Sequence, residues 1–255
     1  MNVRPKKHLG QHFLTSQEIA RRIAEIFKND SPQRVLEIGP GTGVLTRHLC
    51  ELYPHVEAIE IDGESVNYLH QYNILPPFNI HEGDFLRLDI RALVQEPTAL
   101  IGNFPYNIST QIMFRLVELR DLFPQAGGMF QKEVAERIAA PPGSKVYGIL
   151  SVWVQAFYKV EYAFTVAEGA FNPPPKVKSG VIYLTRLEKP RITGNPAEFL
   201  RLVKTAFGQR RKMLRRSLAG YSFSSEQKEM PIFERRPETL SVEEFDQLLG
   251  LLKYE

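Results

Sequence analysis

The sequence predicts an α/β fold, in which a mostly parallel sheet carries helices on both faces and is followed by a small all-α domain at the C-terminus. Three observations predict it. Between residues 33 and about 140, strand-length apolar runs alternate with stretches of helical periodicity. The first of these runs, at 35–38, leads directly into a glycine-rich turn. After about residue 190 the strand-like patterns stop and apolar residues recur at helical spacing, so we expect a domain of residues 1–188 and a helical domain of residues 189–255.

The expected elements follow in order from the N-terminus. Residues 16–27 predict a helix capped by Thr15 or Ser16. Strands of the parallel sheet are expected near 34–38, 56–61, 78–82, 98–102 and 126–131, with helices near 43–53, 63–72, 107–119 and 132–139. A basic loop at 141–148 and a helix near 149–157 come next, and strands near 158–166 and 179–187 are expected to join the sheet as a hairpin-like pair. The apolar positions that predict C-terminal helices are Phe199, Leu202, Val203, Ala206, Phe207, Leu214 and Leu218.

Composition limits the class of protein. The chain has 255 residues, a formal charge of +3 and a single cysteine, Cys50, so no disulfide can form within it. Residues 1–14 lack the apolar core of a signal peptide, and no apolar run approaches the ~18 residues of a membrane span. We therefore expect a soluble cytoplasmic protein. No dimer motif is evident, and we expect a monomer.

The glycine turn at 39–43 predicts a cofactor site. Gly39 and Gly41 let the backbone approach a ligand closely, but the dinucleotide pattern G-x-G-x-x-G fails because Val44 stands at its last position. The acidic Glu37 at the end of the strand suits a cationic ligand without phosphates, such as S-adenosylmethionine. Glu60, at the carboxyl end of the next strand, is placed to accept hydrogen bonds from both ribose hydroxyls.

Two further strand ends carry candidate site residues. Asp84 can accept a hydrogen bond from an adenine amino group, and Phe85 can lie against the adenine ring. At the end of the following strand, Pro105 holds Phe104 extended, so that the carbonyl of Phe104 and the side chain of Asn103 are available as acceptors. Acceptors of this kind can take both protons of an exocyclic amine such as adenine N6 and favour a pyramidal nitrogen that attacks a methyl group.

Aromatic residues complete the predicted catalytic site. Tyr106 offers a face for stacking an adenine that has left its helix. Phe171, which precedes three prolines, is expected to form the other side of a sandwich around that base. The predicted catalytic residues are therefore Asn103, Phe104, Tyr106 and Phe171.

Basic residues predict contact with nucleic acid. Arg4, Lys6 and Lys7 form an N-terminal basic arm, and His8 and His12 beside it are rejected as metal ligands because no third ligand is near. The run 209–216 has five cationic residues, and as a helix it would present a phosphate-binding stripe. The predicted RNA-binding residues are Arg4, Lys6, Lys7, Arg210, Arg211, Lys212 and Arg215.

Taken together, these motifs show that the chain resembles the bacterial small-subunit (16S) ribosomal RNA adenine N6,N6-dimethyltransferases. The resemblance is carried by residues 9–14, 37–43, 103–109, 131–134, 171–177 and 209–212, and it covers nearly the whole chain. It implies a Rossmann-like methyltransferase with S-adenosylmethionine as methyl donor and two adjacent adenines near the 3′ end of 16S rRNA as target, within an immature small subunit. It also implies a cofactor site lined by His12, Leu14, Gly39, Glu60, Asp84 and Asn103, although many members of the family have Asn in place of His12 and Leu in place of Phe104.

Other functions remain open at this stage. The related 23S rRNA adenine methyltransferases of macrolide resistance share the active site but are not expected to carry the 209–212 run. A largely non-catalytic assembly factor of the small subunit would not need the intact loop at 103–106. A DNA adenine methyltransferase would be expected to have a separate base-reading domain, and a dehydrogenase is disfavoured by Val44.

Overall fold

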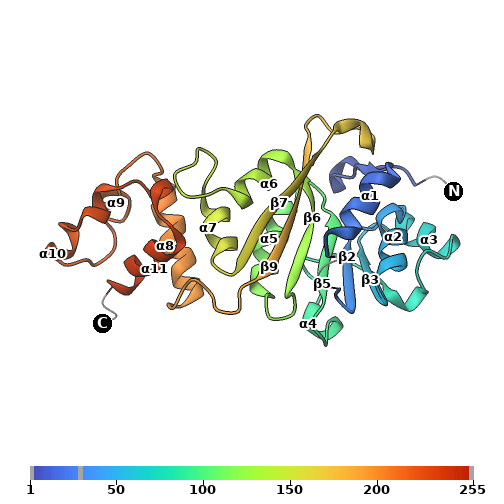
Figure 1. The fold of residues 1–255 in the computed structure, drawn as a ribbon, viewed down its shortest axis with the longest axis horizontal. Helices are drawn as coiled ribbons and strands as arrows, with labels where there is room; N and C mark the ends of the chain where they lie inside the picture. Colours follow the sequence, from blue (N-terminus) through green and yellow to red (C-terminus); the bar gives the residue numbers. More distant parts are fainter. Residues whose placement is uncertain (1–2, 28–30, 253–255) are drawn as a thin grey trace. The chain divides into compact units, whose positions relative to one another are not determined.

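The structure is a computed structural model that describes residues 3–27 and 31–252 (Figure 1). Residues 1 and 2 of the predicted N-terminal domain lie outside this part. The chain forms two compact units, one of Met1–Glu136 with Val160–Arg186 and one of Arg137–Lys159 with Leu187–Glu255. Each unit is described by itself.

The first unit is built on a seven-stranded sheet. Its strands are β2 (Arg34–Ile38), β3 (His55–Glu60), β4 (Ile80–Glu82), β5 (Ala99–Asn103), β6 (Gln125–Gln131), β7 (Tyr158–Val166) and β9 (Ser179–Arg186). They lie in the order β4-β3-β2-β5-β6-β9-β7. The five strands from β4 to β6 pair in parallel, whereas β9 pairs antiparallel with β6. The predicted α/β fold and the placement of the last two strands beside the parallel sheet are confirmed.

Helices connect the strands as the periodicity predicts. They are α1 (Gln17–Ala24), α2 (Val44–Leu52), α3 (Gly63–Gln71), α4 (Ile90–Leu93), α5 (Ser109–Glu118) and α6 (Lys132–Ala139), with 3-10 turns η1 (Lys7–Leu9), η2 (Glu25–Phe27), η3 (Pro77–Asn79) and η4 (Glu168–Ala170). The Ser16 side chain accepts a hydrogen bond from the Ile19 amide and caps α1, and Asp62 caps α3 through the Glu64 amide. Both caps fix where a helix begins after an extended segment.

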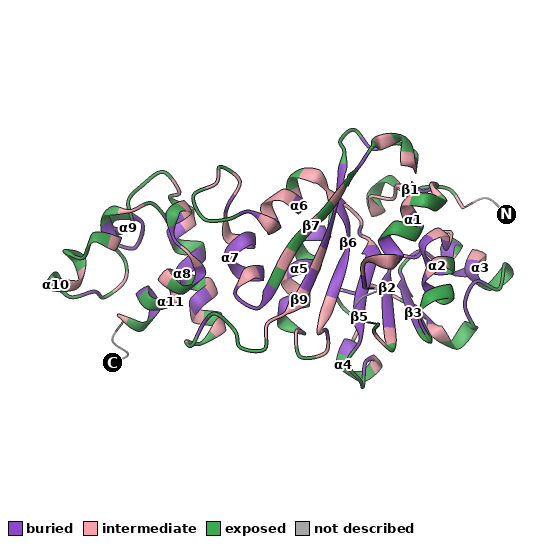
Figure 2. Cartoon of the chain, in the orientation of Figure 1, coloured by how far each residue is buried: buried purple, intermediate pink, exposed green. Residues whose placement is uncertain are grey.

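The sheet is buried on both faces, which positions its strand ends firmly. One cluster contains Val35, Ala58 and Ile101 together with apolar residues of α1, α2 and α3. Leu36, Ile59 and Leu100, the neighbours of those strand residues, are equally buried but lie outside that cluster, because alternate residues of a strand point to opposite faces. The central strands are accordingly coloured as buried in Figure 2.

A small second sheet was not predicted. Strand β1 (Phe13–Leu14) pairs antiparallel with β8 (Phe171–Asn172), with Leu14 opposite Phe171. A two-residue strand is too short to show a hydrophobic period, so no local pattern could have indicated it. The pairing joins the N-terminal segment to the segment that carries the prolines.

The second unit is helical. It contains α7 (Ile149–Gln155), α8 (Pro196–Gly208), α9 (Leu214–Ser217), α10 (Ser225–Lys228) and α11 (Val242–Gly250), with turns η5 (Pro231–Glu234) and η6 (Pro237–Thr239). The predicted apolar positions of its C-terminal part are buried except Phe207, which is half-buried, and the Phe207 ring lies 5.9 Å from the Phe245 ring. Sequence reasoning assigned 137–159 to the first domain, but this segment groups with the C-terminal helices. The apolar sequence of a helix such as α7 indicates that the helix is buried, but it does not indicate which of two hydrophobic cores the helix packs into.

The basic run does not form the predicted helix. Helix α8 ends at Gly208, residues 209–213 form a turn, and the short α9 begins at Leu214. The buried face of α8 contains Phe199, Leu202, Val203 and Ala206, so one more turn of helix would bring Arg210 onto that face. The turn keeps the cations outward, and this part of the prediction was wrong. No helix in the described residues is long and apolar enough to cross a membrane.

Candidate active site

A cavity of about 250 Å³ opens at the carboxyl ends of the parallel strands. It is lined by residues that follow β2, β3, β4 and β5 and by residues 8–13 of the N-terminal segment. Strand ends separated widely in sequence therefore meet at one edge of the sheet, as expected for a parallel α/β fold. Of the predicted site residues, the cavity lining includes His12, Gly39, Gly41, Glu60, Asp84, Phe85, Asn103, Phe104 and Tyr106.

The glycine turn and Glu60 form one side of the cavity. Gly41 has φ +56°, a left-handed conformation that favours glycine, and its amide donates to Glu60 Oε2 at 2.9 Å. The amide of Asp62 donates to Glu60 Oε1 at 2.9 Å. Burial raises the pKa of Glu60, although these backbone hydrogen bonds oppose the shift. Two amides therefore fix the orientation of a carboxyl that borders the cavity.

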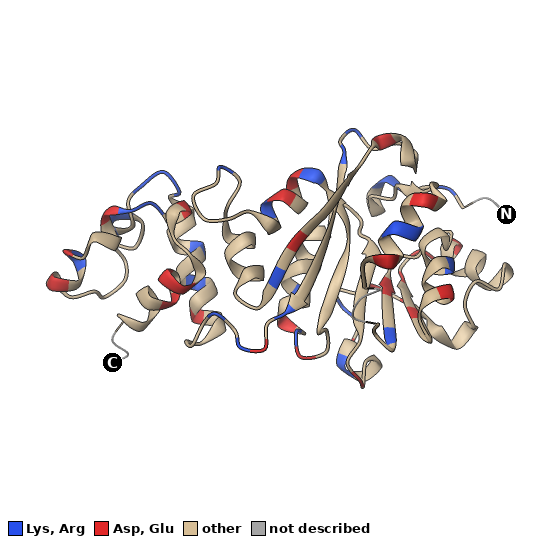
Figure 3. Cartoon of the chain, viewed as in Figure 1, with Lys and Arg blue, Asp and Glu red and all other residues tan. Residues whose placement is uncertain are grey.

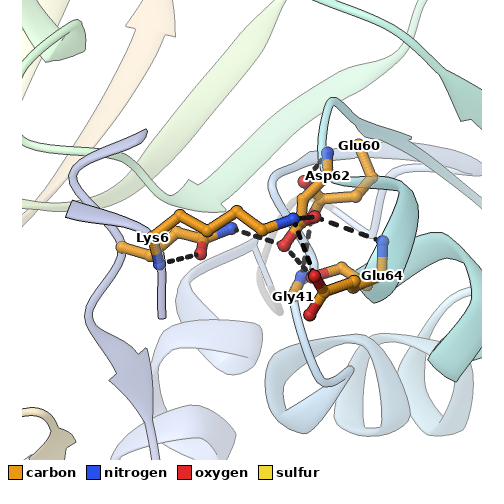
Figure 4. A network of polar contacts seen from close by, with 7 residues as sticks. Lys6, Gly41, Glu60, Asp62 and Glu64 are labelled. Atoms are coloured by element: carbon orange, nitrogen blue, oxygen red, sulfur yellow. Dashed lines mark hydrogen bonds and ion pairs between the residues drawn. The ribbon is translucent and has the colours of Figure 1, made fainter. Parts of the chain in front are cut away.

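Asp62 ties the N-terminal segment to this side of the cavity, as Figure 4 shows. Lys6 Nζ donates to Asp62 Oδ1 at 2.5 Å and lies 3.3 Å from Glu64 Oε1, while Gln11 Nε2 donates to Asp62 Oδ2 at 3.1 Å. Burial alone would raise the pKa of Asp62, but the hydrogen bonds from Lys6 and Gln11 outweigh it and the pKa is lowered. The structure places the Lys6 ammonium in an ion pair with Asp62, and the RNA contact expected of Lys6 stays a prediction.

The N-terminal segment also reaches the opposite side of the cavity. Gly10 has φ +65°, a left-handed conformation that favours glycine, and a Cβ built there would lie 2.4 Å from Asn107 Oδ1. Asn103 Nδ2 donates to the His12 carbonyl at 2.9 Å. This hydrogen bond uses the amide nitrogen of Asn103 and leaves its Oδ1 as the atom that can accept from a ligand.

Tyr106 is held at two points. Its hydroxyl shares a hydrogen bond of 2.5 Å with Ser179 Oγ, and its ring stacks on the His12 ring with centroids 5.4 Å apart. His12 Nδ1 lies 2.8 Å from the Pro173 carbonyl. His12 thus touches the predicted catalytic loop through both its ring and its backbone. Burial raises the pKa of the Tyr106 phenol, so the hydroxyl remains neutral and bonded to Ser179.

Asp84 and Phe85 occupy the third strand end. Asp84 Oδ1 accepts from the Leu86 amide at 2.9 Å, which fixes the carboxylate at the start of a turn. Phe85 is buried, with part of its surface on the cavity. Both residues border the same cavity as Glu60, on the side formed by β4 and the turn that follows it.

Leu14 and Phe171 lie elsewhere than predicted. Both side chains belong to the hydrophobic core beside α1, and neither lines the cavity. Phe171 is 4% exposed. Its ring is therefore not available as one side of a base sandwich in this structure, and the core accounts for its burial.

Glu37 is a buried carboxyl behind the glycine turn. It is 1% exposed, and its Oε2 has no hydrogen-bond partner among the described residues. Burial, together with the charge of Glu60, raises the pKa of Glu37 to about 8. The side chain does not line the cavity, so it does not face a ligand directly as the sequence argument assumed.

The remaining predicted RNA-binding residues are mostly exposed. Arg4, Lys7, Arg211, Lys212 and Arg215 are exposed, with Arg215 Nη1 3.8 Å from Glu234 Oε1. Arg210 is half-buried and donates from Nη2 to the Lys145 carbonyl at 2.7 Å. Figure 3 shows the concentration of basic residues in the segment between α8 and α9.

Sequence reasoning missed several cavity residues. Gln11 and Asn107 hold the N-terminal segment in place, and their partners lie far away in sequence, so no local signal marks them. Ile61 could have been found, because an apolar residue directly after the acidic end of a strand has no core to enter. It lines the cavity and is 49% exposed.

The order of strands in this sheet, with antiparallel β9 inserted between β6 and β7, is that of the Rossmann-like methyltransferases. A model of the family "Ribosomal RNA adenine dimethylase" matches residues 2–253. The chain belongs to the ribosomal RNA adenine dimethylase family.

Individual relatives agree with this assignment. The "Ribosomal RNA small subunit methyltransferase A" of Flavobacterium johnsoniae is 54% identical over 245 residues, which cover 95% of this chain and 94% of the relative. The protein of the same name from Cytophaga hutchinsonii is 48% identical over 252 residues, 98% of each chain. Among solved structures, a dimethyladenosine transferase from Plasmodium falciparum superposes with a TM-score of 0.78 at 30% identity, covering 94% of this chain and 96% of the other.

Proposed function

We propose that this chain transfers methyl groups from S-adenosylmethionine to N6 of two adjacent adenosines near the 3′ end of 16S rRNA, giving dimethyladenosines in an immature small subunit. The observation that carries the proposal is the hydrogen bond from Asn103 Nδ2 to the His12 carbonyl at 2.9 Å. It turns the Asn103 oxygen into an oriented acceptor on the cavity that Glu60 borders. Family membership and the relatives named for small-subunit methylation support the substrate.

The residues around the cavity fit S-adenosylmethionine. The Glu60 carboxyl, held by two backbone amides, can accept from ribose hydroxyls, and Asp84 can accept from the adenine amino group. Phe85 and Ile61 supply apolar surface for the adenine ring. The approach of the backbone at Gly39 and Gly41 leaves room for the rest of the molecule. When bound, the cofactor supplies an electrophilic methyl group on its sulfonium.

The protein's own contribution is to orient the attacking amine. Adenine N6 is a weak nucleophile because its lone pair is delocalised into the ring. Asn103 Oδ1 and the Phe104 carbonyl can accept its two protons, which favours a pyramidal nitrogen with its lone pair free. The fixed acceptors then work mainly by positioning, and no strong base is required because a proton leaves after the methyl group is attached.

Tyr106 provides the surface on which the target base stacks. Its hydroxyl bond to Ser179 and its contact with His12 hold the ring in one orientation. A rigid aromatic surface lowers the entropy cost of holding an unstacked base. Since Phe171 is buried, we assign the stacking role to Tyr106 alone.

We assign the exposed cations of the 209–216 run to the phosphates of the RNA and expect the chain to act as a monomer. The relatives named for small-subunit methylation favour this function over methylation of the large-subunit RNA. The oriented Asn103 acceptor favours catalysis over a purely structural role in assembly.

The test is methyl transfer from labelled S-adenosylmethionine to purified small and large ribosomal subunits that lack their adenine methylations. Dimethyladenosine is expected on the small subunit only, and label on the large subunit would refute the substrate. Asn103→Ala should lower kcat by roughly 10²-fold or more, the usual scale for loss of one preorganised polar group, while binding of the small subunit is retained. Asn67→Ala, an exposed position on α3, is the matched control. Wild-type turnover by the Asn103 variant would contradict the mechanism.

A further inference from the structure

The loop at 141–148 is a part of the second unit that the proposed function does not use. The sequence singles it out as basic, and it connects α6 with α7. Residues 141–143 and Lys145 are exposed, whereas Tyr147 is fully buried. The loop therefore has a buried end and an exposed, cationic tip.

Three contacts fix this loop within the unit. The Gly143 amide donates to the Glu238 carbonyl at 2.7 Å. Arg210 Nη2 donates to the Lys145 carbonyl at 2.7 Å. The Tyr147 ring lies 6.2 Å, centroid to centroid, from the ring of Phe207 on α8. These contacts, at the tip, the middle and the end of the loop, fix the position of the backbone that carries Lys145.

The Arg210 contact joins the loop to the basic run. Arg210 is the first cation of that run, so its guanidinium brings the backbone of Lys145 to the start of the segment between α8 and α9. Within the described part of the chain, no ion pair engages the side chains of Lys145, Arg211 or Lys212. This hydrogen bond thus joins the loop to the start of the basic run, which is 65 residues away in sequence.

We propose that loop 141–148 is a second element of the RNA-binding surface, in which Lys145 contacts a backbone phosphate and Arg210 is the positioning residue that places it. The proposal rests on the proposed function, because it takes RNA as the partner. Exposed ammonium and guanidinium groups that make no ion pair within the described residues are suited to the phosphates of a folded RNA. This gives Arg210 a role different from the direct phosphate contact that the sequence predicted.

The first experiment measures binding of unmethylated small ribosomal subunits over a series of monovalent salt concentrations at fixed magnesium. Lys145→Ala should weaken binding and reduce the slope of log K against log salt by about 0.7 to 0.9, the amount expected for one lost phosphate contact. The matched control is Lys189→Ala, an exposed lysine of the same unit outside the loop and the run. A Lys145→Ala slope equal to that of the control would overturn the RNA contact.

The second experiment separates positioning from direct contact. If Arg210 places Lys145, then Lys145→Ala should cost less in an Arg210→Ala background than in the wild type. Full additivity of the two changes would overturn the positioning role. Arg210→Lys keeps the charge but lacks the guanidinium fork, so it should fall between wild type and Arg210→Ala in affinity.

Methyl transfer distinguishes failure of this inference from failure of the proposed function. In steady-state assays Lys145→Ala should raise KM for the subunit by a larger factor than it lowers kcat. If wild-type protein methylates the small subunit but Lys145→Ala matches the control, only the loop assignment is wrong. If wild-type protein neither binds nor methylates the subunit, the proposed function itself is wrong and the loop assignment falls with it.

Discussion

Replacing Glu37 by Gln should change how the stability of this protein depends on pH. Glu37 is 1% exposed and its pKa is raised from 4.5 to about 8. Well below pH 4.5 the carboxyl is protonated in both the folded and the unfolded chain and makes no pH-dependent contribution. As pH rises, the unfolded chain loses its proton first, because the folded pKa is the higher one. The stability that Glu37 contributes is therefore lost progressively up to a pH of about 8.

The size of the effect follows from the shift. One pKa unit corresponds to about 1.36 kcal/mol, so the full shift corresponds to at most about 5 kcal/mol of unfolding free energy. Relative to wild type, Glu37→Gln should gain stability steadily between pH 5 and pH 8, since glutamine cannot ionise. The glutamine amide also changes the unfolding free energy by an amount that does not depend on pH. This change moves the curve of free-energy difference against pH up or down and leaves its slope the same.

Chemical denaturation at several pH values measures this directly. The quantity to plot is the difference in unfolding free energy between Glu37→Gln and wild type, which removes the contributions of groups that do not interact with Glu37. Glu82→Gln, at the exposed end of β4, serves as the control substitution. A flat difference for Glu37→Gln between pH 5 and pH 8 would refute the argument that burial keeps this carboxyl protonated.

Two further predictions concern the N-terminal segment over the cavity. Gly10→Ala should weaken S-adenosylmethionine binding by about tenfold, because Gly10 has φ +65°, a conformation that strains any residue with a Cβ, and the new Cβ would displace Asn107 Oδ1, now 2.4 Å away. Isothermal titration against Gly169→Ala, where nothing lies within 4 Å, checks it. Lys6→Met should weaken S-adenosylmethionine binding more than it weakens RNA binding, because Lys6 pairs with Asp62, whereas the exposed Lys7→Met should show the reverse. Equal effects of the two lysine variants on RNA binding would return Lys6 to the RNA-binding arm.

The residues at the strand ends could be predicted because the topology of a parallel sheet determines where they lie. Once 34–38 and 98–102 are recognised as parallel strands, Gly39 and Asn103 must lie at the same edge of the sheet, whatever the helices between them do. The structure places both on one cavity. The nature of the residues then indicates the chemistry, since a carboxyl such as Glu60 and a constrained amide such as Asn103 have few uses at such an edge.

Contacts between distant residues could not be predicted in the same way. Lys6 and Asp62 are 56 residues apart, and a lysine near the N-terminus has the same local pattern whether it binds phosphate or a carboxylate. The sequence around Phe171, which precedes three prolines, is compatible with a stacking residue and with a core residue. The structure buries the side chain in the core. The prediction of a helix over 209–216 was wrong because the end of α8 depends on which face of that helix is buried. A cluster of charged residues does not indicate which face that is.

The route of the chain between the two units bears on how the protein folds during synthesis. Residues 137–159 belong to the second unit, yet they leave the ribosome before 160–186, which complete the first. At an elongation rate of ~5–20 residues per second, the apolar helix α7 waits for seconds before its partner α8 is made. During this interval Leu150, Val152 and Val154 have no finished core to enter. The nascent chain therefore carries a temporarily exposed apolar helix, and the last quarter of the sequence is needed to cover it.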